Sequence, residues 1–167
     1  MTGLDQIREA VADYLNQNGV KAVTAWTARP RDGAGAPVCA VSLRRCEAVG
    51  SAFCDYLGER YNPETASWQA LYGKRVEVTL GLDLYAGADA GGEEAIRAAF
   101  DALAGALQNG GPEGLRLERL TCGETEFDVE EGRYRCGVEA AGRAFLCAAA
   151  EEGELFLDFV LKGEWKH

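Results

Sequence analysis

The sequence predicts an α+β fold, in which a mostly antiparallel or mixed sheet of about five to six strands carries two main helices on one face. Two segments have helical apolar spacing, and the segments between and after them have strand character. Two helices are too few to cover both faces of such a sheet, so we expect them to share one face. The opposite face then has no cover from within the chain.

The first helix is expected from residue 4 to about residue 18. Its apolar side chains recur at helical spacing, at Leu4, Ile7, Val11 and Leu15. Asp5 lies in the first turn, and Asn18-Gly19 provides a stop signal. The pattern predicts an amphipathic helix that packs on the sheet.

Two strands are expected next, at residues 20–28 and at about residues 37–47. The first, VKAVTAWTA, is rich in strand formers, and the second lies within PVCAVSLRRCEA. The stretch RPRDGAGAP between them is rich in turn residues. We therefore expect these two strands to form a hairpin.

An aromatic-rich insertion follows at about residues 50–74, and it contains YLGERYNPETASWQALYG. A connection between neighbouring elements usually needs only about 2–6 residues, so this one is long. Trp68, Leu71 and Tyr72 have the spacing of one short helical face, which starts after the Asn62-Pro63 turn.

The clearest strand in the sequence is VEVTLGLDL, in which apolar residues from Val76 to Leu84 alternate with polar residues or glycine. The second helix is expected in EEAIRAAFDALAGALQNGG, which ends at Asn109-Gly110. Its apolar stripe consists of Ile96, Phe100, Leu103 and Leu107.

The last third reads as strands. Residues 115–129 and 133–150 flank a hairpin turn at Glu130-Glu131-Gly132, and ELFLDFVLKGEW forms a further strand with Leu155, Leu157, Phe159 and Leu161 on one face. With no internal repeat and no linker, we expect residues 1–167 to form a single domain.

The composition limits the classes of partner. The chain has 47% hydrophobic and 26% charged residues, which is typical of a globular protein. Its 27 acidic and 17 basic residues give a formal charge of −10, which argues against sequence-specific nucleic-acid binding and against docking on an anionic membrane. We find no segment that resembles a signal peptide or a membrane span, so we expect a cytoplasmic protein. The cysteines form no CxxC pair and are expected to be free thiols, mostly buried: Cys39, Cys46, Cys54, Cys122, Cys136 and Cys147.

No catalytic constellation emerges, and we expect neither a cofactor nor an enzymatic role. The only histidine is His167, which argues against histidine-based catalysis and histidine-centred zinc sites. The row Glu124, Glu126 and Asp128 alternates along one strand and would project its carboxylates to one side. Such a row could bind a divalent cation or supply an acid–base pair, or it could be the solvated face of a strand.

The order of the elements and the stretch RYNPETASWQALYGKRVEVTLGLDLYA, residues 60–86, resemble the tail terminator (tail-completion) proteins of tailed bacteriophages and prophages. The resemblance covers most of the chain. It implies a non-enzymatic α/β protein that forms a six-membered ring on the head-proximal end of the tail tube. The ring ends tube polymerisation and provides the surface that joins the head. Its implied partners are further copies of itself, the tail tube protein and a head-completion protein, first in the host cytoplasm and then in the virion tail.

On that reading the aromatic insertion forms a contact with a neighbouring subunit or with the tube. The residues expected in the contact are Tyr56, Tyr61, Trp68, Leu71 and Tyr72. The alternative is that the insertion folds back and caps its own sheet. The net acidity would suit a channel that lets DNA pass without binding it. Two other classes stay open: another neck or connector component of a virion, and a small-molecule or metal-binding enzyme that uses the carboxylate row.

Overall fold

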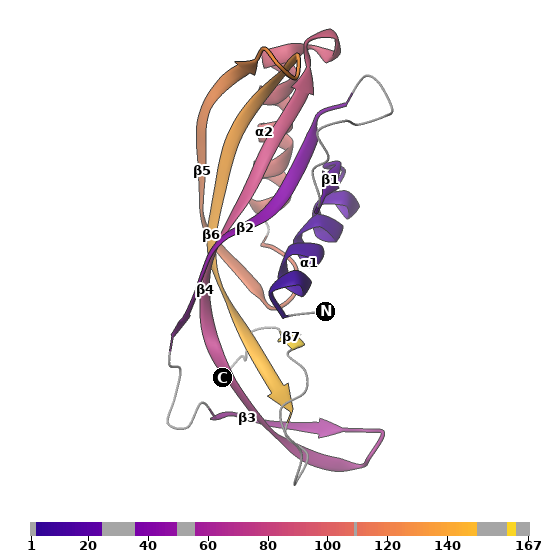
Figure 1. The fold of residues 1–167 in the computed structure, drawn as a ribbon. Helices are drawn as coiled ribbons and strands as arrows, with labels where there is room; N and C mark the ends of the chain where they lie inside the picture. The colour runs from indigo at the N-terminus through magenta and orange to yellow at the C-terminus, as the bar shows by residue number, and fades with distance from the viewer. Residues whose placement is uncertain (1–2, 25–35, 50–55, 109, 150–159, 163–167) are drawn as a thin grey trace.

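The computed structural model describes residues 3–24, 36–49, 56–108, 110–149 and 160–162 (Figure 1). The elements are, in chain order, α1 (Gly3–Gln17), β1 (Ala22–Val23), β2 (Val38–Val49), β3 (Tyr56–Asn62), β4 (Ser67–Gly87), a 3-10 helix (Ala88–Ala90), α2 (Gly92–Gln108), β5 (Leu115–Asp128), β6 (Arg133–Ala149) and β7 (Val160–Lys162).

The strands form one sheet, in which the order β1-β2-β4-β6-β5 is extended by β3, which pairs with β4, and by β7, which pairs with β6. All the pairings are antiparallel except that of β1 with β2. The predicted α+β class is confirmed. The long strands β2 to β6 match the expected number, and the short strands β1 and β7 bring the described sheet to seven. Both helices lie on the same side of the sheet (Figure 1).

The core lies between that side of the sheet and the two helices. The alternation predicted for β4 is confirmed, because Val76, Val78, Leu80, Leu82 and Leu84 are all at most 2% exposed. They pack with Ile7, Val11 and Leu15 of α1 and with Ile96 and Leu103 of α2. Each such side chain contributes on the order of 1.5–3 kcal/mol when it leaves water. The apolar side of the sheet and the apolar sides of the two helices therefore face one another and form one core.

The predicted hairpin of the first two strands is wrong. The strand β1 has only two residues and pairs with β2 in parallel, with Ala22 beside Cys39. The side chain of Asn16 explains this, because its amide donates to the Ala22 carbonyl and its oxygen accepts from the Ala22 N–H. The chain that leaves α1 is thereby held beside the helix end and enters the sheet in the direction of β2. Residues 25–28 of the predicted strand lie outside the described residues.

The predicted short helical face in the insertion is also wrong. Strands β3 and β4 form an antiparallel hairpin, and β4 continues without interruption for 21 residues. At the turn, the Asn62 side chain accepts a hydrogen bond from the Glu64 N–H, and Ala66 adopts a φ of 50°. Aromatic side chains favour strands in which they can pair across the ladder. The spacing of Trp68 and Tyr72 therefore follows a strand face.

The hairpin projects beyond the part of the sheet that the helices cover, at the end of the molecule opposite the β5–β6 turn (Figure 1). The predicted β5–β6 hairpin is confirmed. Of the last predicted strand, Val160–Lys162 pairs with β6, and most of its proposed apolar face lies outside the described residues. Neither described helix is long and apolar enough to cross a membrane.

Candidate functional site

The β3–β4 hairpin carries four aromatic rings on one face. Tyr61 lies directly opposite Trp68, with ring centroids 5.5 Å apart and an interplanar angle of 63°. Tyr56 lies opposite Tyr72, with values of 5.6 Å and 64°. Both pairs are edge-to-face, which is a preferred geometry for aromatic side chains. We call these four residues the aromatic face.

Much of the aromatic face is open to solvent. The exposed fractions are 42% for Tyr56, 48% for Tyr61 and 68% for Trp68, while Tyr72 is half-buried. Exposed aromatic residues that gather in one place mark interaction surfaces more often than scattered ones do. Each ring already packs against its partner, so little side-chain freedom remains to be lost on binding. The geometry suits an anchor for an apolar groove.

Leu71 is the member of the predicted set that the fold separates from the others. It lies on the opposite face of β4 and is 1% exposed, on the same face as Gln69, which is also buried. A one-residue step along a strand reverses the side-chain direction, which a helical reading of residues 68–72 could not show. The described surface therefore consists of four of the five predicted residues.

The carboxylate row does not converge on a site. Glu126 and Asp128 lie opposite Arg135 and Arg133, and Glu124 falls in an irregular stretch between Cys122 and Thr125. The Asp128 carboxylate accepts hydrogen bonds from the N–H groups of the β5–β6 turn. All three carboxylates are exposed, and no group of three or more potential metal ligands gathers within the described ranges.

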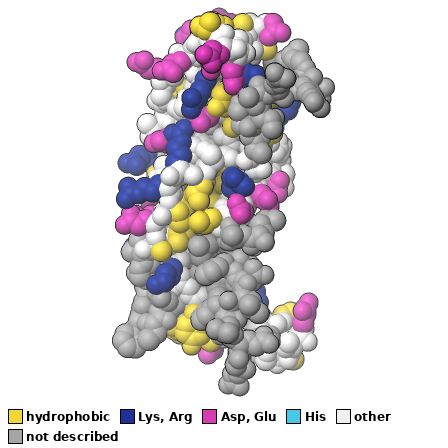
Figure 2. Space-filling model, viewed as in Figure 1, with side chains coloured by type: hydrophobic (Ala, Val, Ile, Leu, Met, Phe, Trp, Pro, Cys, Tyr) yellow, Lys and Arg dark blue, Asp and Glu magenta, His cyan; other side chains and the backbone are white. Residues whose placement is uncertain are grey.

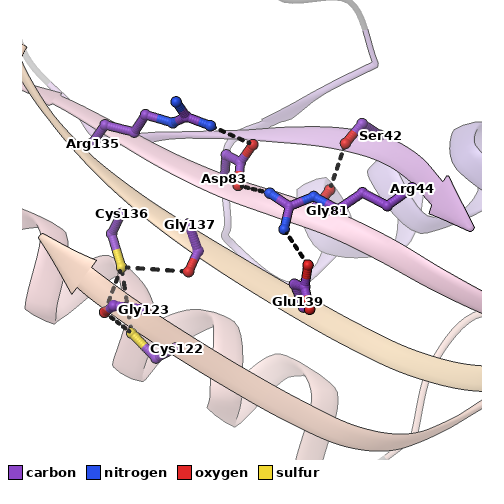
Figure 3. Close-up of polar contacts among 10 residues, drawn as sticks. All are labelled: Ser42, Arg44, Gly81, Asp83, Cys122, Gly123, Arg135, Cys136, Gly137 and Glu139. Atoms are coloured by element: carbon purple, nitrogen blue, oxygen red, sulfur yellow. Dashed lines mark hydrogen bonds and ion pairs between the residues drawn. The ribbon is translucent and has the colours of Figure 1, made fainter. Parts of the chain in front are cut away.

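The sheet face that the helices leave uncovered carries an ion-pair network that the sequence did not reveal (Figure 3). Arg44 of β2 donates to Asp83 of β4 at 2.5 Å and to Glu139 of β6 at 2.6 Å. Arg135 of β6 lies 3.6 Å from the second oxygen of Asp83. The Asp83 side chain is only 13% exposed, so this carboxylate is the most enclosed member of the network. The network links three adjacent strands.

Two backbone features position Arg44. It is the extra residue at a register shift between Leu43 and Arg45, and its side chain lies directly over Gly81. A Cβ atom at residue 81 would lie 2.6 Å from Arg44 Nε and 2.5 Å from Ser42 Oγ. Burial alone would lower the pKa of Arg44, but its hydrogen bonds to Glu139 and Asp83 and their charges raise it overall. The available signal in the sequence was Asp83 itself, an acid in the middle of a buried strand.

Arginines are concentrated on this uncovered face. The strand pairing places eight of the described arginines on this face: Arg44, Arg45, Arg75, Arg116, Arg119, Arg133, Arg135 and Arg143. Acidic side chains alternate with them, and Arg143 pairs with Glu118 across β5 and β6. A depression of about 390 Å³ lies among Arg45, Glu77, Arg119 and Arg143. In Figure 2 basic side chains gather along the left side, and acidic ones gather at the upper end. The charges of this acidic chain are thus unevenly distributed.

The four cysteines whose side chains are described are free thiols, as predicted. Cys39 and Cys136 are buried, Cys46 is half-buried and Cys122 is exposed. Burial, and then the charge of Asp83, raises the pKa of Cys39 to about 12. Such a thiol stays protonated and unreactive at neutral pH. The sulfur atoms of Cys122 and Cys136 lie 3.4 Å apart.

No protein-family model matches this chain, and no curated protein matches it. Solved structures do match. One is a chain from the virion of a native gene transfer agent (GTA) particle, with 17% sequence identity and a TM-score of 0.32 over 86% of this chain and 92% of that one. A similarity of this degree does not identify the function of the chain.

Proposed function

We propose that this protein is a structural component of a phage or prophage tail. In this proposal it assembles as a ring of about six copies on the end of the tail tube, ends the polymerisation of the tube and offers a surface to the head. The resemblance of residues 60–86 to tail terminator proteins motivates the proposal. The partners are then further copies of this chain, the tail tube protein and a head-completion protein.

The observation that carries the proposal is the aromatic face on a projecting hairpin. Trp68 is 68% exposed at a place where the chain reaches beyond the helix-covered part of its sheet (Figure 1). An exposed tryptophan costs solubility unless a partner covers it, and tryptophan and tyrosine dominate the energetics of interfaces. A subunit with such an arm can reach a neighbour without rearranging its core.

The absence of convergent chemistry in the described residues agrees with an assembly role. The carboxylate row is spread along an edge strand, and Asp128 is already used in a turn. The most enclosed charged side chain of the uncovered face, Asp83, is engaged by arginines on two neighbouring strands. The Asp128 and Asp83 carboxylates therefore hold a turn and neighbouring strands together.

The proposal is tested first by the mass of the assembly. Light scattering behind size exclusion over a wide concentration range, with negative-stain images, should show a ring of about six subunits. Trp68→Ala should weaken that ring. Val129→Ala is the matched control, because Val129 is 82% exposed but lies in the β5–β6 turn, at the other end of the molecule. The control should assemble like the unchanged protein.

A second arm uses purified tail tubes, since a tube can stabilise a ring that does not persist alone. The unchanged protein and the Val129→Ala variant should bind tube ends, and Trp68→Ala should bind at least about tenfold more weakly, which is the loss of one interface anchor. A chain that is monomeric at every concentration and also ignores tubes would overturn the proposal. Binding to another neck component instead would move the chain to the connector class.

A further inference from the structure

Cys122 of β5 and Cys136 of β6 direct their sulfur atoms at one another across the edge of the sheet (Figure 3). Their Sγ atoms are 3.4 Å apart. We propose that the two residues form a redox modification site, at which a small-molecule disulfide of the glutathione class converts the two thiols into an intramolecular disulfide. The inference is independent of the proposed tail function.

A local irregularity brings the two thiols together. Cys122 lies opposite Val138 and Cys136 lies opposite Thr125, so the two cysteines are diagonal neighbours on one face. Diagonal neighbours of a regular antiparallel pair are separated by about 7–8 Å. Here two residues of β5, Gly123 and Glu124, face only one residue of β6, which shifts the register.

Glycine makes the close approach of the two strands possible. A Cβ atom on Gly123 would lie 3.1 Å from the carbonyl oxygen of Gly137, tighter than side chains normally allow. The Gly123 carbonyl also lies within hydrogen-bond reach of both thiols, at 3.4 Å from Cys122 Sγ and 3.5 Å from Cys136 Sγ. The shared acceptor holds both sulfur atoms on the same side of the strand pair, as a disulfide requires.

The two thiols differ in accessibility, which assigns their roles. Cys122 is exposed on the outermost strand of the main sheet path, whereas Cys136 is 1% exposed. Burial, and then the contact with Cys122, raises the pKa of Cys136 to about 11. A dissolved reagent therefore meets Cys122 first, and Cys136 completes the reaction from within the sheet.

The exchange proceeds in two balanced steps. In the first step Cys122 releases its proton to water, and its thiolate attacks one sulfur of the small disulfide. The S–S bond of the reagent breaks, one thiolate leaves, and a mixed disulfide remains on Cys122. Cys136 then releases its proton, attacks the Cys122 sulfur and expels the second thiolate. The protein loses two electrons and two protons, and the reagent becomes two thiols.

The disulfide would fasten β5 to β6, its neighbour in the described sheet. The cysteines are 14 residues apart in sequence and enclose the β5–β6 turn. Closing a loop of this length raises the thermal midpoint by about 6–12 °C for a chain of this size. A cytosolic glutathione pool keeps such a pair reduced, whereas an oxidising medium closes it. The pair would therefore respond to a change of compartment.

The test equilibrates the full-length protein with mixtures of reduced and oxidised glutathione at different ratios, followed by acid quenching, peptide mapping and thermal unfolding. We expect the mapped linkage to join Cys122 to Cys136 and the midpoint to rise by the shift given above. Cys122→Ser should abolish both effects, and because residue 122 is exposed this variant should fold. Cys46→Ser is the matched control, since Cys46 lies on β2 and should leave the effect of oxidation unchanged.

Three outcomes would overturn the inference. The pair could stay reduced at every ratio, Cys122 could link to a different cysteine or to a second chain, or the midpoint could rise by the same amount in Cys122→Ser. Amide hydrogen exchange adds an independent readout, because the amides between residues 122 and 136 should exchange more slowly after oxidation. Unchanged exchange despite the mapped linkage would refute the fastening of β5.

Discussion

Replacing Asp83 by asparagine tests whether the ion-pair network holds the uncovered face together. The change keeps the size of the side chain but removes the charge that faces Arg44 at 2.5 Å and Arg135 at 3.6 Å. Asp83 is the member to change because its side chain is only 13% exposed, compared with 32% for Arg44 and 50% for Glu139. Its interactions are therefore the least screened by water.

The magnitude follows from the kind of bond that is lost. Hydrogen bonds to charged groups contribute about 1.5–3 kcal/mol and neutral ones about 0.5–1.5 kcal/mol, so one exchanged bond costs about 1–1.5 kcal/mol. The longer contact to Arg135 adds a few tenths, while Glu139 continues to neutralise Arg44. We expect Asp83→Asn to lower the free energy of unfolding by about 1–2 kcal/mol, which corresponds to a fall of about 2–8 °C in Tm.

Urea unfolding followed by circular dichroism measures this difference. Glu47→Gln is the matched control, because Glu47 pairs with Arg45 on the same sheet face but the two side chains are 57% and 74% exposed. Exposed pairs of this kind contribute roughly 0–1 kcal/mol, so the control should cost less than Asp83→Asn. A double-mutant cycle with Arg44→Ala isolates the pair. Equal losses in Asp83→Asn and Glu47→Gln, or a coupling energy near zero, would refute the reasoning.

Three further changes test other parts of the structure. Gly81→Ala should displace Arg44, because the added Cβ would lie 2.6 Å from Arg44 Nε. The double variant with Asp83→Asn should lose less free energy of unfolding than the sum of the two single variants. Fully additive losses in urea unfolding would contradict this expectation. Cys39 has its pKa raised to about 12, so the folded thiol keeps its proton while the unfolded thiol ionises above about pH 9. Its contribution to the free energy of unfolding is therefore complete below pH 9 and falls between about pH 9 and 12, by at most about 1.4 kcal/mol per pH unit. Cys39→Ala should remove this contribution to the loss of stability at alkaline pH. Trp68→Ala should lower the free energy of unfolding of the monomer by only about 0.5–1.5 kcal/mol, the contribution of its pair with Tyr61; a much larger loss would show that Trp68 is a core residue of its own chain.

Local patterns in the sequence were enough to predict both helices, the central strand and the main core. Apolar residues alternate from Val76 to Leu84 and recur at helical spacing in α1 and α2. Each pattern predicts which side of its strand or helix is buried. Burying these sides together leaves few arrangements other than two helices on one face of the sheet. The end of α1 followed in the same way, since Gly19 adopts a φ of 82°.

The two wrong predictions depended on contacts between segments, which the pattern within one segment does not show. The direction of β1 follows from hydrogen bonds between Asn16 and Ala22, which no periodicity encodes. The spacing of Trp68 and Tyr72 fits a helix and a strand equally well, and cross-strand pairing with Tyr61 and Tyr56 selects the strand. Short aromatic segments remain ambiguous until their partners are known.

The residues alone were enough to predict an acidic α+β protein with an aromatic-rich insertion and a single histidine, His167. Which side chains of the insertion share a surface could be seen only in the fold, because the burial of Leu71 and the exposure of Trp68 depend on how the strand is paired. The fold likewise brings Arg44 to Asp83, 39 residues away, and Cys122 to Cys136. Such contacts depend on strand register, and register is fixed when the whole sheet closes on its core.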